Sequence, residues 1–160
     1  MLLFVKNVVF TILMPGTVAI FVPVYVFAHP LVNASAASFV AGLPLVLGAA
    51  VYSWCLWDFA VTGRGTPAPI DPPKVLVVRG LYQYARNPMY VGVLSVICGW
   101  ALLFQSLTLA IYAMCMAAAF HLFVLLYEEP HLRRVFGASY EHYCLEVNRW
   151  LPLGKRRSAA

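Results

Sequence analysis

Four long apolar runs constrain this chain more than any other feature of its sequence. They cover residues 4–28, 38–61, 90–104 and 107–127, and a helix needs about 20 residues to cross a bilayer. The chain is 62% hydrophobic and only 11% charged, whereas a soluble domain is about 25% charged. A water-soluble fold of this length cannot bury so much apolar surface. The sequence therefore predicts an all-α integral membrane protein with four transmembrane helices, in a single domain over residues 1–160.

Only Gln105 and Ser106 separate the third run from the fourth. Two helices joined by so short a polar segment predict a tight hairpin. In the third run, Gly92, Ser95 and Gly99 recur on one helical face, and such small-residue stripes let membrane helices approach closely. We expect the fourth run to pack against this stripe through its alanines, which are Ala110, Ala113 and Ala117.

Acidic and basic residues lie on one side of this predicted topology. Lys6 lies at the start of the first run and Asp58 near the end of the second; several charges lie in segment 62–89, and the remainder follow the fourth run. The connections 29–37 and 105–106 contain no Lys, Arg, Asp or Glu. Because cytoplasmic loops are enriched in Lys and Arg, we expect cytoplasmic termini, a cytoplasmic segment 62–89 and a bacterial inner-membrane location.

The net charge of +5 fits anionic lipid headgroups at such a membrane. No basic helix or stacking platform lies outside the apolar runs, which argues against nucleic-acid binding. The four cysteines show no CxxC or Cys/His spacing, so the sequence predicts neither a metal site nor a disulfide framework.

Two polar segments outside the apolar runs have recognisable patterns. Segment 66–73 has four prolines in eight residues, which favours an extended, stiff conformation. After Glu128, apolar residues at helical spacing alternate with charged ones and predict a C-terminal amphipathic cytoplasmic helix, on the membrane or closing over the bundle. Its apolar positions are Phe136, Tyr140, Tyr143, Val147 and either Trp150 or Leu151.

Two clusters of polar residues stand at the ends of the predicted hairpin. The first comprises Tyr82, Arg86, Asn87, Pro88 and Tyr90, and the second Glu128 and Glu129. A hairpin brings both clusters to the same membrane face. Arginine binds carboxylates bidentately, carboxylates accept from ammonium or hydroxyl groups, and the start of a helix favours an anion. The clusters therefore predict a pocket for a ligand that carries both charges.

Each of these residues also has a structural interpretation. Arg86 can be a positive-inside anchor, and the tyrosines an interfacial belt. Glu129 can pair with Arg133 one helical turn later. His121 lies two helical turns before Glu128, on the same face; a histidine within a span indicates function, but a hydrogen-bonded packing role fits equally well.

The order of the motifs adds a resemblance. GLYQYARNPMYVG, followed by a hairpin and then by LLYEEPHLRRVFGASYEHYCLEVNRWLP, resembles the superfamily of isoprenylcysteine carboxyl methyltransferases and phospholipid methyltransferases. The resemblance covers residues 54–152. NPMYVG with LLYEEP is most similar to phosphatidylethanolamine N-methyltransferases, and the GTPAPIDPP and FGASY segments to bacterial relatives of the isoprenylcysteine enzymes. Two positions depart from the latter enzymes: Asn87 stands where they carry His, and Arg149 is the nearest counterpart of a basic residue after their Tyr-x-x-Tyr pair.

The resemblance implies a helical membrane bundle in which the first polar cluster and the two glutamates line an S-adenosylmethionine pocket. The implied reaction is methyl transfer to a membrane-embedded lipophilic acceptor, either a phospholipid headgroup amine or an isoprenylcysteine-like carboxylate. Glu128, Glu129 and His121 are candidates for removing a proton, and Arg149 for orienting an anionic acceptor.

Other functions remain open from the sequence. The acceptor could be a small thiol or a prenylated compound. The chain could also be a non-enzymatic assembly subunit or a small four-helix transporter. A proton-coupled transporter needs a carboxylate near the bilayer midplane, whereas Asp58 lies at the end of a predicted span.

Overall fold

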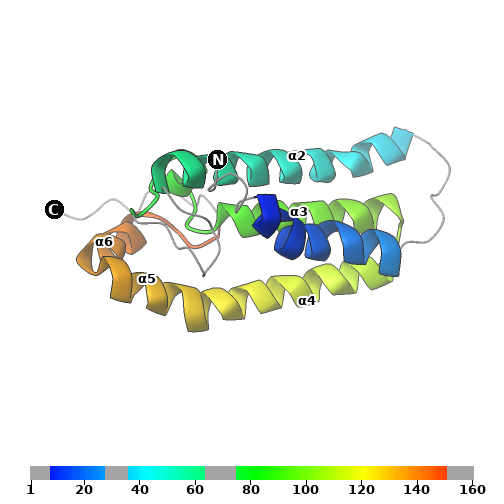
Figure 1. Ribbon diagram of the computed structural model, residues 1–160. Helices are drawn as coiled ribbons and strands as arrows, with labels where there is room; N and C mark the ends of the chain where they lie inside the picture. Colours follow the sequence, from blue (N-terminus) through cyan, green and yellow to red (C-terminus); the bar gives the residue numbers. More distant parts are fainter. Residues whose placement is uncertain (1–7, 28–35, 64–74, 151–160) are drawn as a thin grey trace.

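The computed structural model describes residues 8–27, 36–63 and 75–150, and the regular elements in these ranges are helices. They are η1 (Ile12–Val26), α2 (Ala36–Asp58), η2 (Phe59–Gly63), η3 (Gly80–Gln83), α3 (Pro88–Leu103), α4 (Leu107–Phe123), η4 (Val124–Glu128), α5 (Glu129–Phe136) and α6 (Ala138–Glu146). Figure 1 shows η1, α2, α3 and α4 side by side, with α5 and α6 at one end. We call this the site end and the opposite end the turn end. The all-α class is confirmed for the described residues, and the proline-rich segment 66–73 lies outside them.

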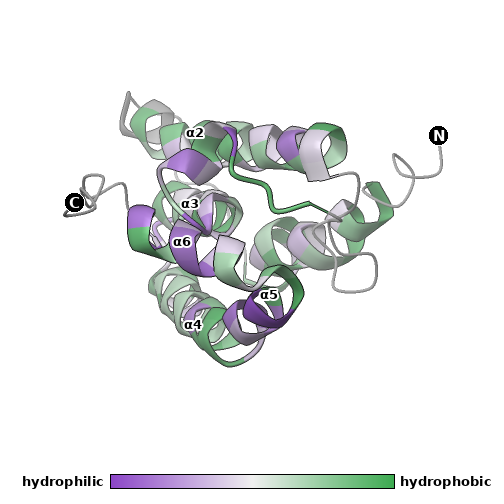
Figure 2. Cartoon of the chain, turned by 90° about the vertical axis from the view of Figure 1, so that its left-hand side faces the viewer, coloured by the Kyte–Doolittle hydropathy of each residue, from purple (hydrophilic) through white to green (hydrophobic). Residues whose placement is uncertain are grey.

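Three helices are long and apolar enough to cross a membrane: Val8–Val26, Val40–Gly63 and Leu107–Phe136. α3 is apolar but shorter, with 16 residues. Figure 2 shows that these helices are largely hydrophobic and that hydrophilic residues gather on α5 and α6. The last long helix continues past its predicted end at Tyr127, because the wide turns of η4 lead directly into α5. The molecule is therefore a multi-pass membrane protein.

α3 packs most closely against α2. A Cβ atom on Gly48 of α2 would lie 2.5 Å from the carbonyl oxygen of Gly92, and one on Gly99 would meet Leu45. The small-residue stripe of α3 therefore faces α2, and the prediction that it faces the fourth run was wrong. A stripe of small residues identifies the face that permits close approach, but its spacing does not identify the neighbour.

The turn between α3 and α4 comprises residues 104–106. Gln105 adopts a positive φ of 48°, and the Ser106 hydroxyl accepts a hydrogen bond from the Leu109 amide at 3.3 Å. Phe104 and Leu109 are buried beside this turn with Ala101. The hairpin predicted around Gln105 and Ser106 is present.

The C-terminal segment forms two short helices, where the sequence predicted one helix through Trp150. Gly137 separates them with a φ of 51°, a conformation that glycine adopts without strain. α6 ends at Glu146, and Val147 after it is extended. The predicted apolar stripe is buried within the molecule, where Tyr140, Tyr143 and Val147 form a core cluster.

η1 is joined to α4 toward the turn end. Tyr112 of α4 donates a hydrogen bond to the Val18 carbonyl at 2.9 Å, and its ring packs against Phe27. Pro15 and Pro23 lie inside η1, where each lacks an amide donor. Toward the site end, the earlier part of this helix borders a cavity.

Candidate active site

The carboxylate of Glu129 joins three segments that are distant in the sequence. Arg149 donates to it through Nε at 2.6 Å and Nη2 at 3.0 Å. Arg86 Nη1 lies 3.1 Å from Glu129 Oε1, and the side chains of Arg86 and Glu129 are only 10% and 7% exposed. Glu129 thus pairs with these two arginines, rather than forming the helical pair with Arg133 that its spacing also allows. Hydrogen bonding to Glu129 raises the pKa of Arg149, so this guanidinium stays charged.

Residues 147–150, which follow α6 and which we call the strap, lie beside the residues that precede α3. The amides of Arg86 and Asn87 donate to the carbonyls of Asn148 and Arg149 at 2.9 and 3.2 Å, and Ala85 and Asn148 form a parallel bridge. The Asn87 side chain also donates to the Arg149 carbonyl, at 3.2 Å. The residue before a proline disfavours helical geometry, and Asn87 accordingly adopts a non-helical φ of −128° and ψ of 49°, which lets it pair with the strap.

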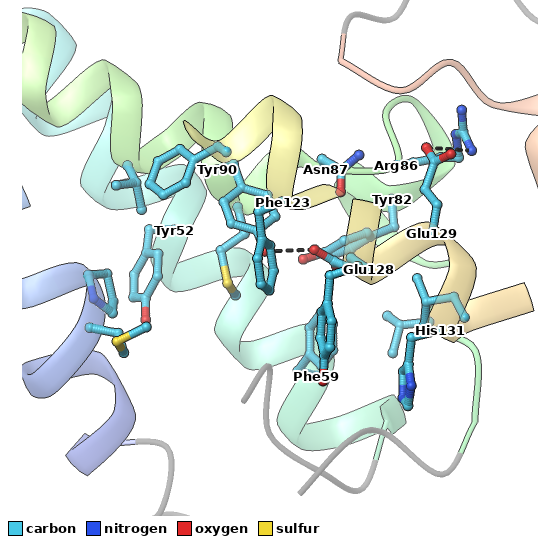
Figure 3. Close-up of a pocket in the computed structure, with 18 of the residues that line it drawn as sticks. Tyr52, Phe59, Tyr82, Arg86, Asn87, Tyr90, Phe123, Glu128, Glu129 and His131 are labelled. Atoms are coloured by element: carbon cyan, nitrogen blue, oxygen red, sulfur yellow. Dashed lines mark hydrogen bonds and ion pairs between the residues drawn. The ribbon is translucent and has the colours of Figure 1, made fainter. Parts of the chain in front are cut away.

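Glu128 has different surroundings from its neighbour. Tyr90 Oη donates to Glu128 Oε2 at 2.7 Å, and no ion pair of Glu128 occurs within the described ranges. The Tyr90 ring packs against Phe120, with centroids 4.9 Å apart. Figure 3 shows the dashed Tyr90–Glu128 bond inside the pocket and Glu129 turned toward Arg86.

A cavity of about 460 Å³ lies beside these residues, within the range of about 300–1,000 Å³ that is usual for ligand pockets. Six predicted cofactor residues line it: Tyr82, Arg86, Asn87, Tyr90, Glu128 and Glu129. Its other walls were not foreseen from the sequence and are largely apolar; they include Phe10, Met14, Val18, Tyr52, Phe59, Met116, Ala119, Phe120 and Phe123. The cavity therefore has a charged end and an apolar end, as Figure 3 shows from Glu129 to Tyr52.

The cavity opens through its apolar flank. Met14, Phe123 and Tyr127 line it, yet they remain 59%, 40% and 48% exposed. Met14 belongs to η1, whereas Phe123 and Tyr127 belong to α4 and η4. The opening therefore lies between η1 and the site end of the last long helix, on a surface suited to lipid.

Three predicted site residues do not line the cavity. Pro88 begins α3, and Arg149 contacts the site through Glu129. His121 accepts a hydrogen bond from Trp150 at 3.1 Å. Conversely, no sequence pattern singled out Cys144, whose sulfur accepts a hydrogen bond from Arg86 Nη1 at 2.7 Å.

Two tyrosines fix α6 against η3. Tyr143 Oη donates to the Tyr82 carbonyl at 2.6 Å. Burial raises the pKa of the Tyr82 and Tyr143 hydroxyls, so both stay protonated and can donate. This contact holds one wall of the cavity in place.

One buried donor of the site lacks a partner. Arg86 Nε is buried, and no hydrogen bond to it is found within the described residues; such unpaired donors are rare in folded proteins. Arg86 and Arg149 carry one more positive charge than Glu129 neutralises, and Glu128 supplies a separate carboxylate. The arrangement suits a ligand with both a carboxylate and a cationic group.

Comparison with known proteins gives one family. The sequence model described as phospholipid methyltransferase matches residues 36–139. This range covers more than half of the chain and includes both polar clusters but not the strap. Neither the curated proteins nor the solved structures give a significant match.

Proposed function

The chain belongs to the phospholipid methyltransferase family, and on this premise we propose that it transfers a methyl group from S-adenosylmethionine to a lipophilic acceptor in the membrane. The cavity carries the proposal, because it joins a charged end to an apolar opening. A phospholipid headgroup amine or an isoprenylcysteine-like carboxylate fits such a cavity, with the acceptor's apolar part at the opening. A small thiol would not use the apolar end.

The residues at the charged end fit S-adenosylmethionine. The unpaired Arg86 Nε would donate to its carboxylate, and Glu128 would accept from its ammonium group or ribose hydroxyls. Aromatic rings of the lining, such as Tyr82 and Tyr127, offer faces for a purine. When bound, this cofactor supplies a methyl group on a sulfonium, which is already activated for transfer.

The chain's own residues then position the partners and exclude water, which is the main contribution a protein makes to such a reaction. An ammonium or thiol acceptor must first lose a proton, and the Glu128 carboxylate, which lines the cavity, could take it. Arg149 has two donors committed to Glu129. Its role in this proposal is to hold Glu129 and Arg86 in place.

We further propose that α3 is a fourth transmembrane helix, with both termini and segment 62–89 in the cytoplasm. The charged residues of the α5–α6 region support this orientation through the positive-inside rule. The cofactor would then reach the charged end from the cytosol, and the acceptor would enter between η1 and α4 from the bilayer.

Calorimetric titration of the detergent-purified chain with S-adenosylmethionine and S-adenosylhomocysteine tests the proposal. We expect saturable binding that is lost in Arg86→Ala and kept in Arg134→Ala, since Arg134 is exposed on α5. Radiolabelled methyl transfer to lipid extracts, sorted into amine and carboxylate lipids, then identifies the acceptor. No binding by folded wild-type protein would overturn the proposal and favour a membrane assembly role.

A further inference from the structure

His121 faces the strap rather than the cavity. Its Nδ1 accepts a hydrogen bond from Trp150 Nε1 at 3.1 Å, and the two rings lie 5.9 Å apart. His121 is not among the residues that line the cavity. A neutral imidazole has one donor and one acceptor nitrogen, so this bond uses the acceptor of His121.

Trp150 connects this bond to the site. Its ring meets Tyr90 edge-to-face, with centroids 6.4 Å apart, and Tyr90 in turn donates to Glu128. The preceding strap residues, Asn148 and Arg149, pair with the backbone before α3. Trp150 is therefore the strap residue that reaches α4 and Tyr90 together.

We propose that His121 is a positioning residue that anchors the strap through Trp150, and that Trp150 thereby holds Tyr90 in the orientation that binds Glu128. The hydrogen bond and ring contacts form a continuous path from His121 to Glu128. This role replaces the earlier interpretation of His121 as a proton acceptor for the substrate.

The geometry argues against a direct catalytic role. A general base must come within hydrogen-bonding reach of the proton that it removes. The Nδ1 atom of His121 is committed to Trp150, whereas Glu128 lies at the cavity. The strap also keeps its ties to Arg86, Asn87 and Glu129 without His121, so loss of the anchor should misalign the site without unfolding the protein.

Four variants distinguish an anchor from a base. His121→Asn keeps an acceptor close to the position of Nδ1 but cannot act as a base near neutral pH. His121→Leu removes the acceptor, Trp150→Phe removes the donor, and the double variant removes both. His142→Leu, an exposed position on α6, is the control.

We expect His121→Asn and the control to bind S-adenosylhomocysteine like the wild type. His121→Leu and Trp150→Phe should each lose about two- to tenfold in affinity, the effect of one hydrogen bond between neutral groups. The double variant should be no weaker than either single variant, because both changes break the same contact.

Hydrogen–deuterium exchange provides a test that needs no ligand. The amides of Arg86 and Asn87 donate to the strap, so their exchange should be faster in His121→Leu and Trp150→Phe and unchanged in His121→Asn. The affinity measurement rests on the proposed function, whereas the exchange measurement does not. Absence of binding in every protein, including the wild type, would therefore count against the function alone.

Two results would overturn the proposal that His121 anchors the strap. In the first, His121→Asn binds S-adenosylhomocysteine as weakly as His121→Leu does, while Trp150→Phe binds it with wild-type affinity. His121 would then act on the ligand directly. The other is unchanged exchange of the Arg86 and Asn87 amides in both His121→Leu and Trp150→Phe.

Discussion

The two ends of the α3–α4 hairpin are held together by different interactions. At the turn end, Phe104 and Leu109 are buried and Ser106 caps α4. At the site end, two arginines share the carboxylate of Glu129. Apolar burial is non-directional, whereas hydrogen bonds weaken steeply when misaligned. The turn end therefore contributes to assembly of the helices, and the site end sets the positions of the residues at the charged end of the cavity.

Glu129→Ala should have the largest effect, because it should damage both stability and binding. It leaves the Arg86 and Arg149 guanidinium groups without their shared carboxylate, and breaking a buried ion pair costs about 3–5 kcal/mol. We expect a lower melting temperature and more than roughly 100-fold weaker S-adenosylhomocysteine binding. Glu141→Ala, on the exposed side of α6, is the matched control. Wild-type melting and affinity in Glu129→Ala would show that the charged network does not organise the site.

Gly48→Ala should reduce stability away from the charged end. Its Cβ would lie 2.5 Å from the Gly92 carbonyl oxygen, so α2 and α3 must separate, at a cost of about 1–3 kcal/mol. Gly42→Ala on the same helix is the control, because no atom lies within 4 Å of its Cβ position. Thermal unfolding in detergent should separate the two variants. Equal melting temperatures would show that close α2–α3 contact is dispensable.

Glu128→Gln should separate binding from stability. The amide oxygen can still accept from Tyr90, so we expect the melting temperature to stay near that of the wild type. Loss of the charge should weaken S-adenosylhomocysteine binding roughly tenfold, as for a hydrogen bond to a charged group. Tyr90→Phe keeps the carboxylate and should weaken binding less. Titration calorimetry compares the two variants, and the opposite order would assign the main ligand contact to Tyr90.

Ser106→Ala should have the smallest effect, confined to the turn end. Loss of an N-cap costs about 1 kcal/mol, and affinity for S-adenosylhomocysteine should not change. Thr108→Ala, at an exposed position of α4, serves as the control for thermal unfolding. A change in affinity would show that the two ends of the hairpin are coupled.

The sequence predicted those features that depend on local order along the chain. The polar residues Gln105 and Ser106 located the turn, and the hairpin then brought Arg86 and Tyr90 close to the two glutamates. Helical spacing suggested Arg133 as the ion-pair partner of Glu129, but Glu129 forms an ion pair with Arg149 instead. That contact depends on how the C-terminal segment folds back, which helical spacing does not encode.

The apolar walls of the cavity could not be predicted for a related reason. Met14 and Tyr52 come from different helices, and in a chain this apolar many residues could equally face lipid. Likewise, Gly92 and Gly99 identified a face for close packing but not α2 as its partner. Gly137 divides α5 from α6, although the apolar spacing on both sides suggested one continuous helix.

The strap has a consequence for biosynthesis. Asn87 and Arg149 contact each other across 62 residues of sequence, and ribosomes add about 5–20 residues per second. For several seconds after the α3 segment is made, the nascent chain has its first helices but no Arg149 to pair with Glu129. The first helices are therefore synthesised before the charged cluster around Glu129 can form, which makes that cluster a late feature of biosynthesis.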